Sequence, residues 1–195
     1  REVIAAHVLL RMMLTSCVDR VAPPGAWRFV AAPDGKPRLD PGIGYGEVAF
    51  NLSHPHALVA VALSVRCVIG IDVERLDSSK ADTVLAEEYF APAEVQLLRA
   101  TPAAERLACF FRLWTLKEAY IKANGQGLSL PLDQFDVTLH PGEPAALLAT
   151  QHDPDQLRRW SMRSLFPGEG YVGALVAEGH SWQLWCGDWS AILDE

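Results

Sequence analysis

The sequence is short of positive charge. It contains 17 Lys and Arg against 24 Asp and Glu, and its formal net charge is −7. General affinity for nucleic acid depends on many Lys and Arg side chains that neutralise phosphates, so this composition argues against a nucleic-acid partner. An anionic ligand must therefore bind at a local cluster of positive side chains.

The cysteine and histidine spacings that are typical of metal sites are also absent. The four cysteines include no C-x-x-C pair, and the six histidines include no H-E-x-x-H motif. Neither a zinc knuckle nor a disulfide framework is therefore indicated, and a reducing, cytoplasmic setting fits best. The cysteines are Cys17, Cys67, Cys109 and Cys186.

No hydrophobic run is long enough to cross a membrane. The apolar stretch from Val3 to Leu14 is interrupted by His7 and Arg11, whereas a membrane-spanning helix needs about 20 apolar residues. The stretch is typical of an amphipathic helix. Because the chain begins with Arg1 rather than Met, we expect a further segment to precede it.

Apolar residues are plentiful, since they make up 50% of the chain. A chain of 195 residues with this composition can bury a sizeable core in one domain or two small subdomains. No internal repeat or low-complexity segment is present. Helical and strand patterns alternate along the chain, which predicts an α+β (α/β-type) fold.

The local patterns predict individual elements. Helices are expected over residues 3–18, 81–89, 91–98 and 103–123. A Pro-Asp-Gly turn is expected at residues 33–35, between a short strand and an extended piece. Further strands are expected within residues 48–64, 65–76, 135–140, 171–178 and 182–187.

Two carboxylates stand together in the segment "IGIDVERL". Asp72 and Glu74 are two residues apart on an expected strand, so both point to one face while Ile71 and Val73 point to the other. Paired carboxylates suit Mg²⁺, which takes one or two of them together with phosphates of the substrate. The alternative is an edge strand whose solvent face happens to be acidic.

The segment "RLWTLKEAYIK" places charges in an apolar helix. Glu118 and Lys122 are one helical turn apart, and such pairs are commonly exposed ion pairs worth about 0.2–0.5 kcal/mol. However, Phe111 and Trp114 lie on the same face as Glu118, where an apolar rim can tune the basicity of a carboxylate. Together with Lys117, these side chains offer a base and cations for phosphate chemistry.

Two shorter segments offer phosphate-binding side chains. "NLSHPH" presents Ser53 and His54, although the same residues could simply cap a turn. "GKPRL" presents Lys36 and Arg38 beside a proline that fixes the backbone, and Lys36 is the candidate there.

Four segments in this order resemble the Sfp-type 4'-phosphopantetheinyl transferases. They are "GKP" at 35–37, "FNLSH" at 50–54, "IGIDVE" at 69–74 and "WTLKEAYIKANGQGLSLPL" at 114–132. The resemblance runs from the first helix to the late strands and weakens past about His140. It implies two similar α/β halves related by a pseudo-two-fold, which we place at residues 1–68 and 69–195, with coenzyme A and Mg²⁺, or Mn²⁺ in its place, in the cleft between them.

The resemblance also implies the reaction and the partners. A serine hydroxyl of an apo acyl or peptidyl carrier protein would attack the β-phosphate of coenzyme A, which gives the holo carrier and 3',5'-ADP. The carrier could belong to fatty acid, polyketide, peptide or lysine-type pathways. The implied roles are Asp72, Glu74 and Glu118 around the metal, Glu118 as base, Lys122 on the leaving phosphate, Lys117 and Lys36 on the diphosphate, and Ser53 with His54 on the coenzyme's phosphates.

Two other functions use the same residues. A Mg²⁺-dependent phosphohydrolase of a nucleotide or diphosphate would direct the acids and lysines at water instead of a serine. A carrier-binding module without turnover is the non-enzymatic alternative. The resemblance also implies an N-terminal strand and a basic segment before the first helix, which help to hold the adenosine 3'-phosphate, and the given sequence begins at about that helix. Because two halves in one chain can build the whole site, we expect a monomer.

Overall fold

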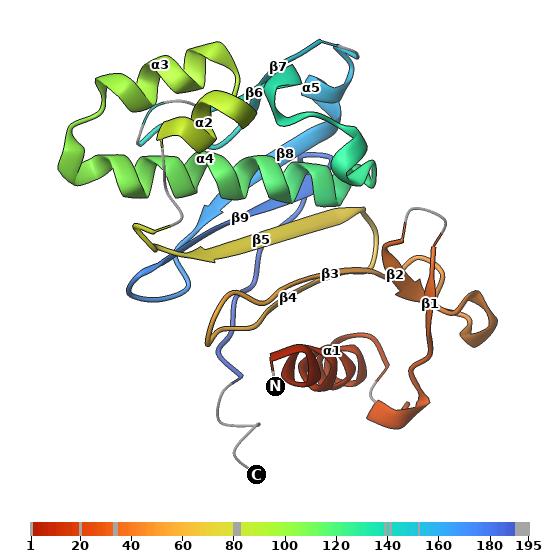
Figure 1. Cartoon of the computed structure of the whole chain (residues 1–195). Helices are drawn as coiled ribbons and strands as arrows, with labels where there is room; N and C mark the ends of the chain where they lie inside the picture. The colour runs from red at the N-terminus through yellow and green to blue at the C-terminus, as the bar shows by residue number, and fades with distance from the viewer. Residues whose placement is uncertain are drawn as a thin grey trace.

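A long helix lying across a small antiparallel sheet forms the centre of the molecule (Figure 1). We describe this arrangement from a computed structural model. It covers residues 2–19, 21–32, 35–79, 83–138, 140, 142–151 and 153–189. Within these ranges, no helix combines the length and the apolar character that crossing a membrane requires.

The central sheet has three antiparallel strands in the order β5-β9-β8. They are β5 (Ile69–Arg75), β9 (Tyr171–Glu178) and β8 (Trp160–Leu165). The helix α4 (Ala103–Asn124) covers one face. On the other side lies the hairpin of β3 (Ala49–Ser53) and β4 (Ala60–Ser64), and beyond it α1 (Glu2–Cys17), as Figure 1 shows.

The alternation of residues along β5 explains this layering. Ile69, Ile71 and Val73 enter the core between the sheet and the β3–β4 hairpin. Asp72 lies on the opposite face, where it contacts α4 through an ion pair described below. Gly70 also faces α4, because a Cβ there would collide with the backbone of that helix. The face of β5 that lacks bulky side chains is therefore the one against which α4 lies.

The end of α4 follows from its last residues. Gly125 adopts the left-handed conformation at φ 79°, and its N–H donates to the carbonyl of Ile121 over 3.0 Å. Glycine is favoured there because a side chain strains this conformation. The end of the helix thus fixes the position of Lys122 in its last turn.

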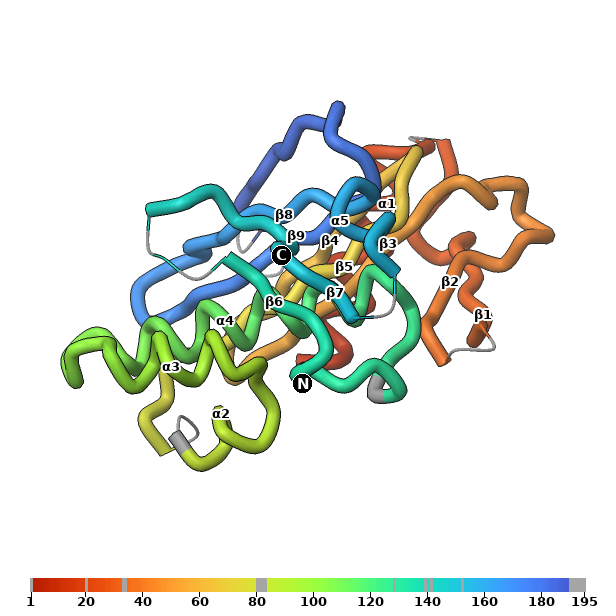
Figure 2. The backbone as a smooth tube through the Cα atoms, turned by 90° about the horizontal axis from the view of Figure 1, so that it is seen from above, coloured from red at the N-terminus to blue at the C-terminus, as the bar shows by residue number. Residues whose placement is uncertain are grey.

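Two pairs of elements lie toward opposite ends of α4. The hairpin of β1 (Phe29–Ala31) and β2 (Pro37–Leu39) is at one end, and α2 (Thr83–Tyr89) with α3 (Pro92–Ala100) is at the other, as Figures 1 and 2 agree. The other elements are β6 (Phe135–Val137), β7 (Leu147–Thr150) and α5 (Gln156–Arg159).

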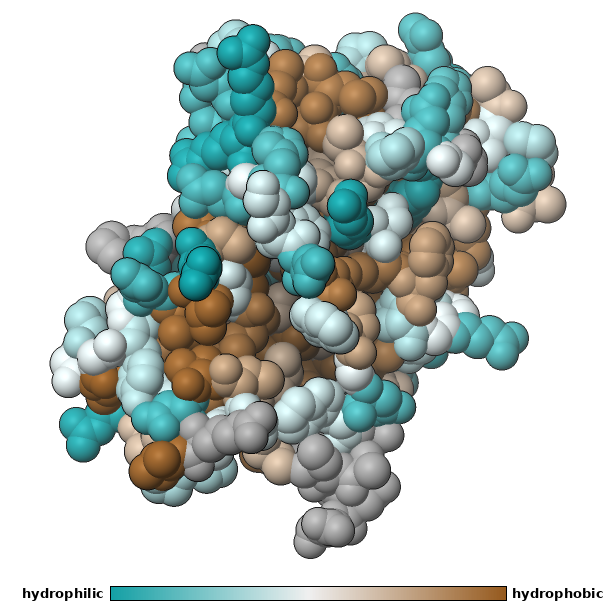
Figure 3. Space-filling model, turned by 180° about the vertical axis from the view of Figure 1, so that it is seen from behind, coloured by the Kyte–Doolittle hydropathy of each residue, from teal (hydrophilic) through white to brown (hydrophobic). Residues whose placement is uncertain are grey.

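Three clusters of buried side chains hold these layers together. The largest surrounds α4, a second lies between the central sheet and β4, and the third joins α1 to the first two hairpins. The surface is not wholly polar. In the view of Figure 3, apolar side chains gather in the lower half, which contains α1 and β1–β4.

Most predicted elements are confirmed. The helix expected at 3–18 is α1, that at 91–98 is α3, and that at 103–123 is α4. The strands expected within 48–76 are β3, β4 and β5, and those at 135–140 and 171–178 are β6 and β9. Residues 33, 34, 81 and 82, which belong to the predicted turn and to the start of the predicted helix 81–89, lie outside the described residues.

The strand predicted at residues 182–187 is wrong. This segment has no regular secondary structure, although its aromatic and aliphatic residues favour a strand. It is held by a side chain instead, because the indole N–H of Trp182 donates to Ser161 Oγ over 2.7 Å. The elements β7, β8 and α5 were not predicted. The mixed α+β class is confirmed, while the pseudo-two-fold and the division at residue 69 stay predictions.

Candidate active site

The candidate site lies where β5 meets α4. Asp72 is only 4% exposed, and its Oδ1 accepts from the ammonium of Lys122 over 2.7 Å. The same ammonium donates to the carbonyl of Ile71 over 3.2 Å. Asp72 Oδ2 is buried and has no hydrogen-bond partner in the described part of the chain. One oxygen of a buried carboxylate is therefore paired and the other is not.

The contact between β5 and α4 depends on Gly70. A Cβ at this position would collide with the carbonyl oxygen of Ala119 and the amide nitrogen of Ala123. Glycine therefore permits the helix backbone to approach the strand closely. This approach brings Lys122 within reach of a carboxylate 50 residues earlier in the sequence.

Three carboxylates share one electrostatic environment at this contact. Burial raises the pKa of Asp72, and the nearby charge of Lys122 opposes the shift. Burial also raises the pKa of Glu118, the charges of Asp72 and Glu74 raise it further, and Lys122 lowers it. The structure therefore brings together the four residues that the sequence predicted for the metal and the chemical step.

The alternative of an exposed pair between Glu118 and Lys122 does not describe this site. Lys122 makes its ion pair with Asp72, and among the described residues no ion pair joins it to Glu118. The Glu118 side chain lies partly buried on α4. The two residues are therefore parts of a contact between helix and sheet and not a surface pair along one helix.

The donor set at this contact fits a hard cation. The described chain contains no cluster of three or more His, Cys, Asp or Glu that could hold a metal ion. However, the partnerless Oδ2 of buried Asp72 is an oxygen donor of the kind that Mg²⁺ or Mn²⁺ prefers. Glu74 and Glu118 add two more carboxylates close enough to influence each other. Metal binding by these three residues stays a prediction.

Lys117 is not placed where the sequence analysis predicted. Its side chain is fully buried, and its ammonium lies 2.8 Å from Glu94 Oε2. It also donates to the carbonyls of Leu132 and Phe135 over 2.7 and 2.5 Å. The three N–H groups of the ammonium are thus matched by three acceptors within the protein, and this arrangement does not support the predicted contact with a diphosphate.

Ser53 and His54 differ in burial. Ser53 is 6% exposed, and its Oγ accepts from the Val73 N–H over 3.0 Å and lies 3.2 Å from Asp72 Oδ1. This hydroxyl contacts the strand of the site, and its contact with a phosphate of the coenzyme stays a prediction. His54, the next residue, is exposed.

Lys36 reaches the site from the β1–β2 hairpin. Its ammonium donates to the carbonyls of Ile69 and Lys122 over 2.9 and 2.8 Å. A cation at the carboxyl end of α4 is favourable because the last carbonyls of a helix carry partial negative charge. Lys36 therefore connects the first hairpin to both β5 and α4.

Sequence reasoning missed two polar residues that shape this region. Asn51 accepts from the Ile71 N–H over 2.8 Å, and Glu94 is the buried partner of Lys117. Signals for both were present. Asn51 alternates with Ser53 along β3, which places them on one face, and Glu94 lies at the third position of a helix, where its carboxylate accepts from the Ala91 N–H.

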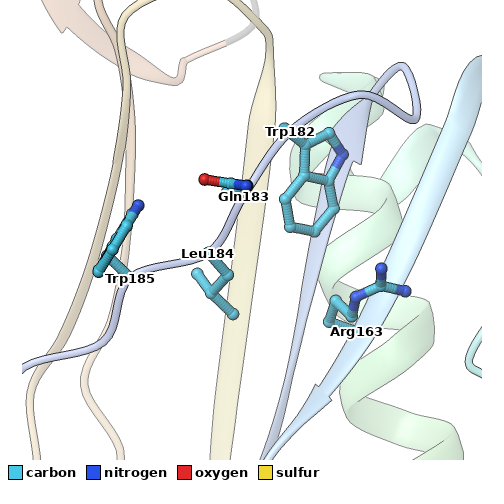
Figure 4. A pocket seen from close by; sticks show the side chains of 5 residues that line it. All are labelled: Arg163, Trp182, Gln183, Leu184 and Trp185. Atoms are coloured by element: carbon cyan, nitrogen blue, oxygen red, sulfur yellow. The ribbon is translucent and has the colours of Figure 1, made fainter.

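A shallow pocket lies elsewhere on the molecule. Figure 4 shows Arg163 of β8 together with Trp182, Gln183, Leu184 and Trp185, which belong to the segment after β9. None of these residues was predicted for the site. The chemistry-bearing side chains are gathered at the contact of β5 with α4 and not in this pocket.

Comparison with known proteins assigns the family. Residues 68–176 match the 4'-phosphopantetheinyl transferase superfamily, and this range contains Asp72, Glu74, Glu118 and Lys122. The chain belongs to this superfamily. The predicted Sfp-type family and the predicted class of enzyme are thereby confirmed.

Individual relatives agree with this assignment. The chain is 36% identical over 183 residues to 4'-phosphopantetheinyl transferase HetI of Nostoc sp. (strain PCC 7120), covering 94% of this chain and 73% of HetI. It is 34% identical over 136 residues to 4'-phosphopantetheinyl transferase Sfp of Bacillus subtilis (strain 168), covering 69% of this chain and 58% of Sfp. The matches therefore span 73% of HetI and 58% of Sfp, so part of each relative has no counterpart in the match.

Among solved structures, the chain is similar to an ACPS-CoA complex of Chronobacterium ammoniagenes. The sequence identity is 18% and the TM-score is 0.46, and the match covers 57% of this chain and 95% of that chain.

Proposed function

We propose that this chain transfers the 4'-phosphopantetheine arm of coenzyme A to a serine of an apo carrier protein and releases 3',5'-ADP. Membership of the transferase family supports the reaction. The single observation that supports the site is the ion pair of Lys122 with buried Asp72, whose second oxygen has no partner within the described chain. A cation and a carboxylate that lie together are groups that phosphate chemistry uses, so this ion pair supports the proposal.

Asp72, Glu74 and Glu118 are the residues that would hold Mg²⁺, or Mn²⁺ in its place. When bound, the metal would neutralise charge on the phosphate oxygens of coenzyme A. The three carboxylates would hold it from one strand and one helix, which Gly70 keeps in close contact.

Glu118 is the proposed general base for the carrier serine. Its pKa is raised by burial and by the neighbouring carboxylates, and a base is more effective when its pKa approaches the working pH. Lys122 would donate to the phosphate that leaves with the adenosine, where negative charge develops. Two of its N–H groups are directed at Ile71 and Asp72, and a Lys ammonium has a third.

Coenzyme A and a carrier protein are the proposed partners. We propose that Lys36 contacts the diphosphate from the β1–β2 hairpin and that exposed His54 contacts a phosphate of the coenzyme. We further propose that the cleft lies between residues 1–68 and 69–195 and that one chain forms a complete site as a monomer. A cytoplasmic location is in keeping with the four free cysteines.

Intact-mass measurement tests the proposal directly. The purified chain is incubated with coenzyme A, Mg²⁺ and a panel of apo carriers from fatty acid, polyketide, peptide and lysine-type pathways. A carrier that gains the mass of the phosphopantetheine arm is the expected result, and Glu118→Gln should slow the gain by about 10²-fold. Consumption of coenzyme A with no gain on any carrier would indicate a hydrolase, and binding without either change would indicate a module without turnover. Both results refute the proposal.

A further inference from the structure

Side chains of β3 hold the outer edge of β5. The inner edge of β5 pairs with β9 over its whole length. On the outer edge, the Ile71 N–H donates to Asn51 Oδ1 over 2.8 Å, and the Val73 N–H donates to Ser53 Oγ over 3.0 Å. These two amides flank Asp72, so the backbone on both sides of this residue is fixed by β3.

The two faces of β3 have different characters. Phe50 and Leu52 point to the cluster that contains α1, whereas Asn51 and Ser53 point to β5. Asn51 is 9% exposed, and burying an amide is unfavourable unless it is hydrogen-bonded. The face of β3 toward β5 is therefore polar at Asn51 and Ser53. These are the two positions whose side chains accept from the amides on either side of Asp72.

We infer that Asn51 is a positioning residue, which with Ser53 holds the Asp72 segment of β5 in the place from which the Asp72 carboxylate acts. The inference rests on the proposed function. Asn51 contacts the backbone of β5 and not the coenzyme, so it acts through Asp72. Ser53 adds a direct contact, since its Oγ lies 3.2 Å from Asp72 Oδ1.

Loss of Asn51 should change turnover more than coenzyme binding. A displacement of about 1 Å in a catalytic group can lower a rate by about 10²-fold, whereas the proposed contacts with the coenzyme come from other residues, Lys36 and His54. We therefore expect Asn51→Leu, which keeps the size of the side chain but removes the acceptor, to lower kcat by about 10-fold or more. The KM for coenzyme A should stay within about twofold.

Two variants separate positioning from general structural damage. Asn51→Asp keeps an acceptor oxygen for the Ile71 N–H and should restore most of the kcat that Asn51→Leu loses. Thr138→Val is the matched control. Thr138 is 2% exposed, and its hydroxyl accepts from the Ala146 N–H over 2.7 Å in the segment between β6 and β7. This variant also removes a buried hydrogen bond but should leave kcat within about twofold.

Kinetics and amide hydrogen exchange together test the inference. In Asn51→Leu the Ile71 amide should exchange faster than in the wild type, and kcat should fall without a matching rise in KM. An unchanged kcat, a fall that Thr138→Val reproduces at equal loss of stability, or unchanged exchange at Ile71 would each overturn the inference. Absence of transfer by the wild type to every carrier would instead refute the proposed function, and the exchange measurement would still decide whether Asn51 holds β5.

Discussion

Replacing Lys117 by Met should strongly destabilise the protein, because it leaves a buried carboxylate without its cation. Lys117 and Glu94 are both fully buried and are 2.8 Å apart. Removing one partner of a buried ion pair typically costs about 3–5 kcal/mol. Methionine fills a similar volume, so the change removes the charge without leaving a large cavity.

The structure places the expected loss near the lower end of this range. Glu94 keeps two other partners, because its oxygens accept from the N–H groups of Ala91 and Val137, each over 3.0 Å. Against this, the carbonyls of Leu132 and Phe135 lose the donor that they share. We therefore expect Lys117→Met to lower the free energy of unfolding by about 3 kcal/mol at neutral pH.

The loss should depend on pH in a definite direction. Burial raises the pKa of Glu94, and the charge of Lys117 opposes this shift, so the pKa of Glu94 should rise further in Lys117→Met. A carboxyl whose folded pKa lies above its unfolded value contributes stability that is complete at low pH and is lost as the pH rises through the folded pKa. The gap between wild type and variant should therefore widen as the pH rises above the unfolded pKa of a Glu carboxyl, about 4.3.

Urea unfolding at several pH values measures both effects. Arg99→Met is the matched control, because Arg99 forms an ion pair with Glu87 in which both side chains are about half exposed. It should cost at most about 1 kcal/mol. The double variant Lys117→Met with Glu94→Gln should be more stable than Lys117→Met alone. A loss for Lys117→Met no greater than that for Arg99→Met, and independent of pH, would refute the reasoning.

Three further changes have defined outcomes. Gly70→Ala should lower the free energy of unfolding by about 1–3 kcal/mol, because its Cβ meets backbone atoms of Ala119 and Ala123; an unchanged urea midpoint would contradict this. Lys36→Ala should raise the KM for coenzyme A more than it lowers kcat, and steady-state kinetics with a loss confined to kcat would move Lys36 into the chemical step. Glu118→Gln should lower kcat by about 10²-fold with unfolding nearly unchanged, whereas transfer at the wild-type rate would remove Glu118 from the mechanism.

Local periodicity predicted the sidedness of β5 correctly. Two-residue alternation placed Asp72 opposite Ile71 and Val73, and the structure confirms this, since the two apolar residues enter a core while Asp72 faces α4. The same reasoning could not identify the partner of Asp72. Lys122 lies 50 residues away, and only the close approach of α4 to β5 brings the two together.

Helical spacing also explains why Lys117 was misplaced. Lys117 and Glu118 are adjacent in the sequence, but consecutive helical residues point about 100° apart. Lys117 lies four residues from Leu113 and from Ile121, both buried, so its side chain lies on the buried face of α4. The neighbouring Glu118 faces the carboxylates of β5 instead. The buried partner Glu94 comes from α3, which no local pattern connects to α4.

The outer edge of β5 has a consequence for how the protein avoids aggregation. An unpaired strand edge is a template on which a strand of another molecule can add. In β5 the groups on this edge are occupied by side chains. Lys36 and Lys122 donate to the carbonyls of Ile69 and Ile71, and Asn51 and Ser53 accept from the amides of Ile71 and Val73. The strand that carries Asp72 is therefore closed to a foreign strand by the same polar residues that arrange the site.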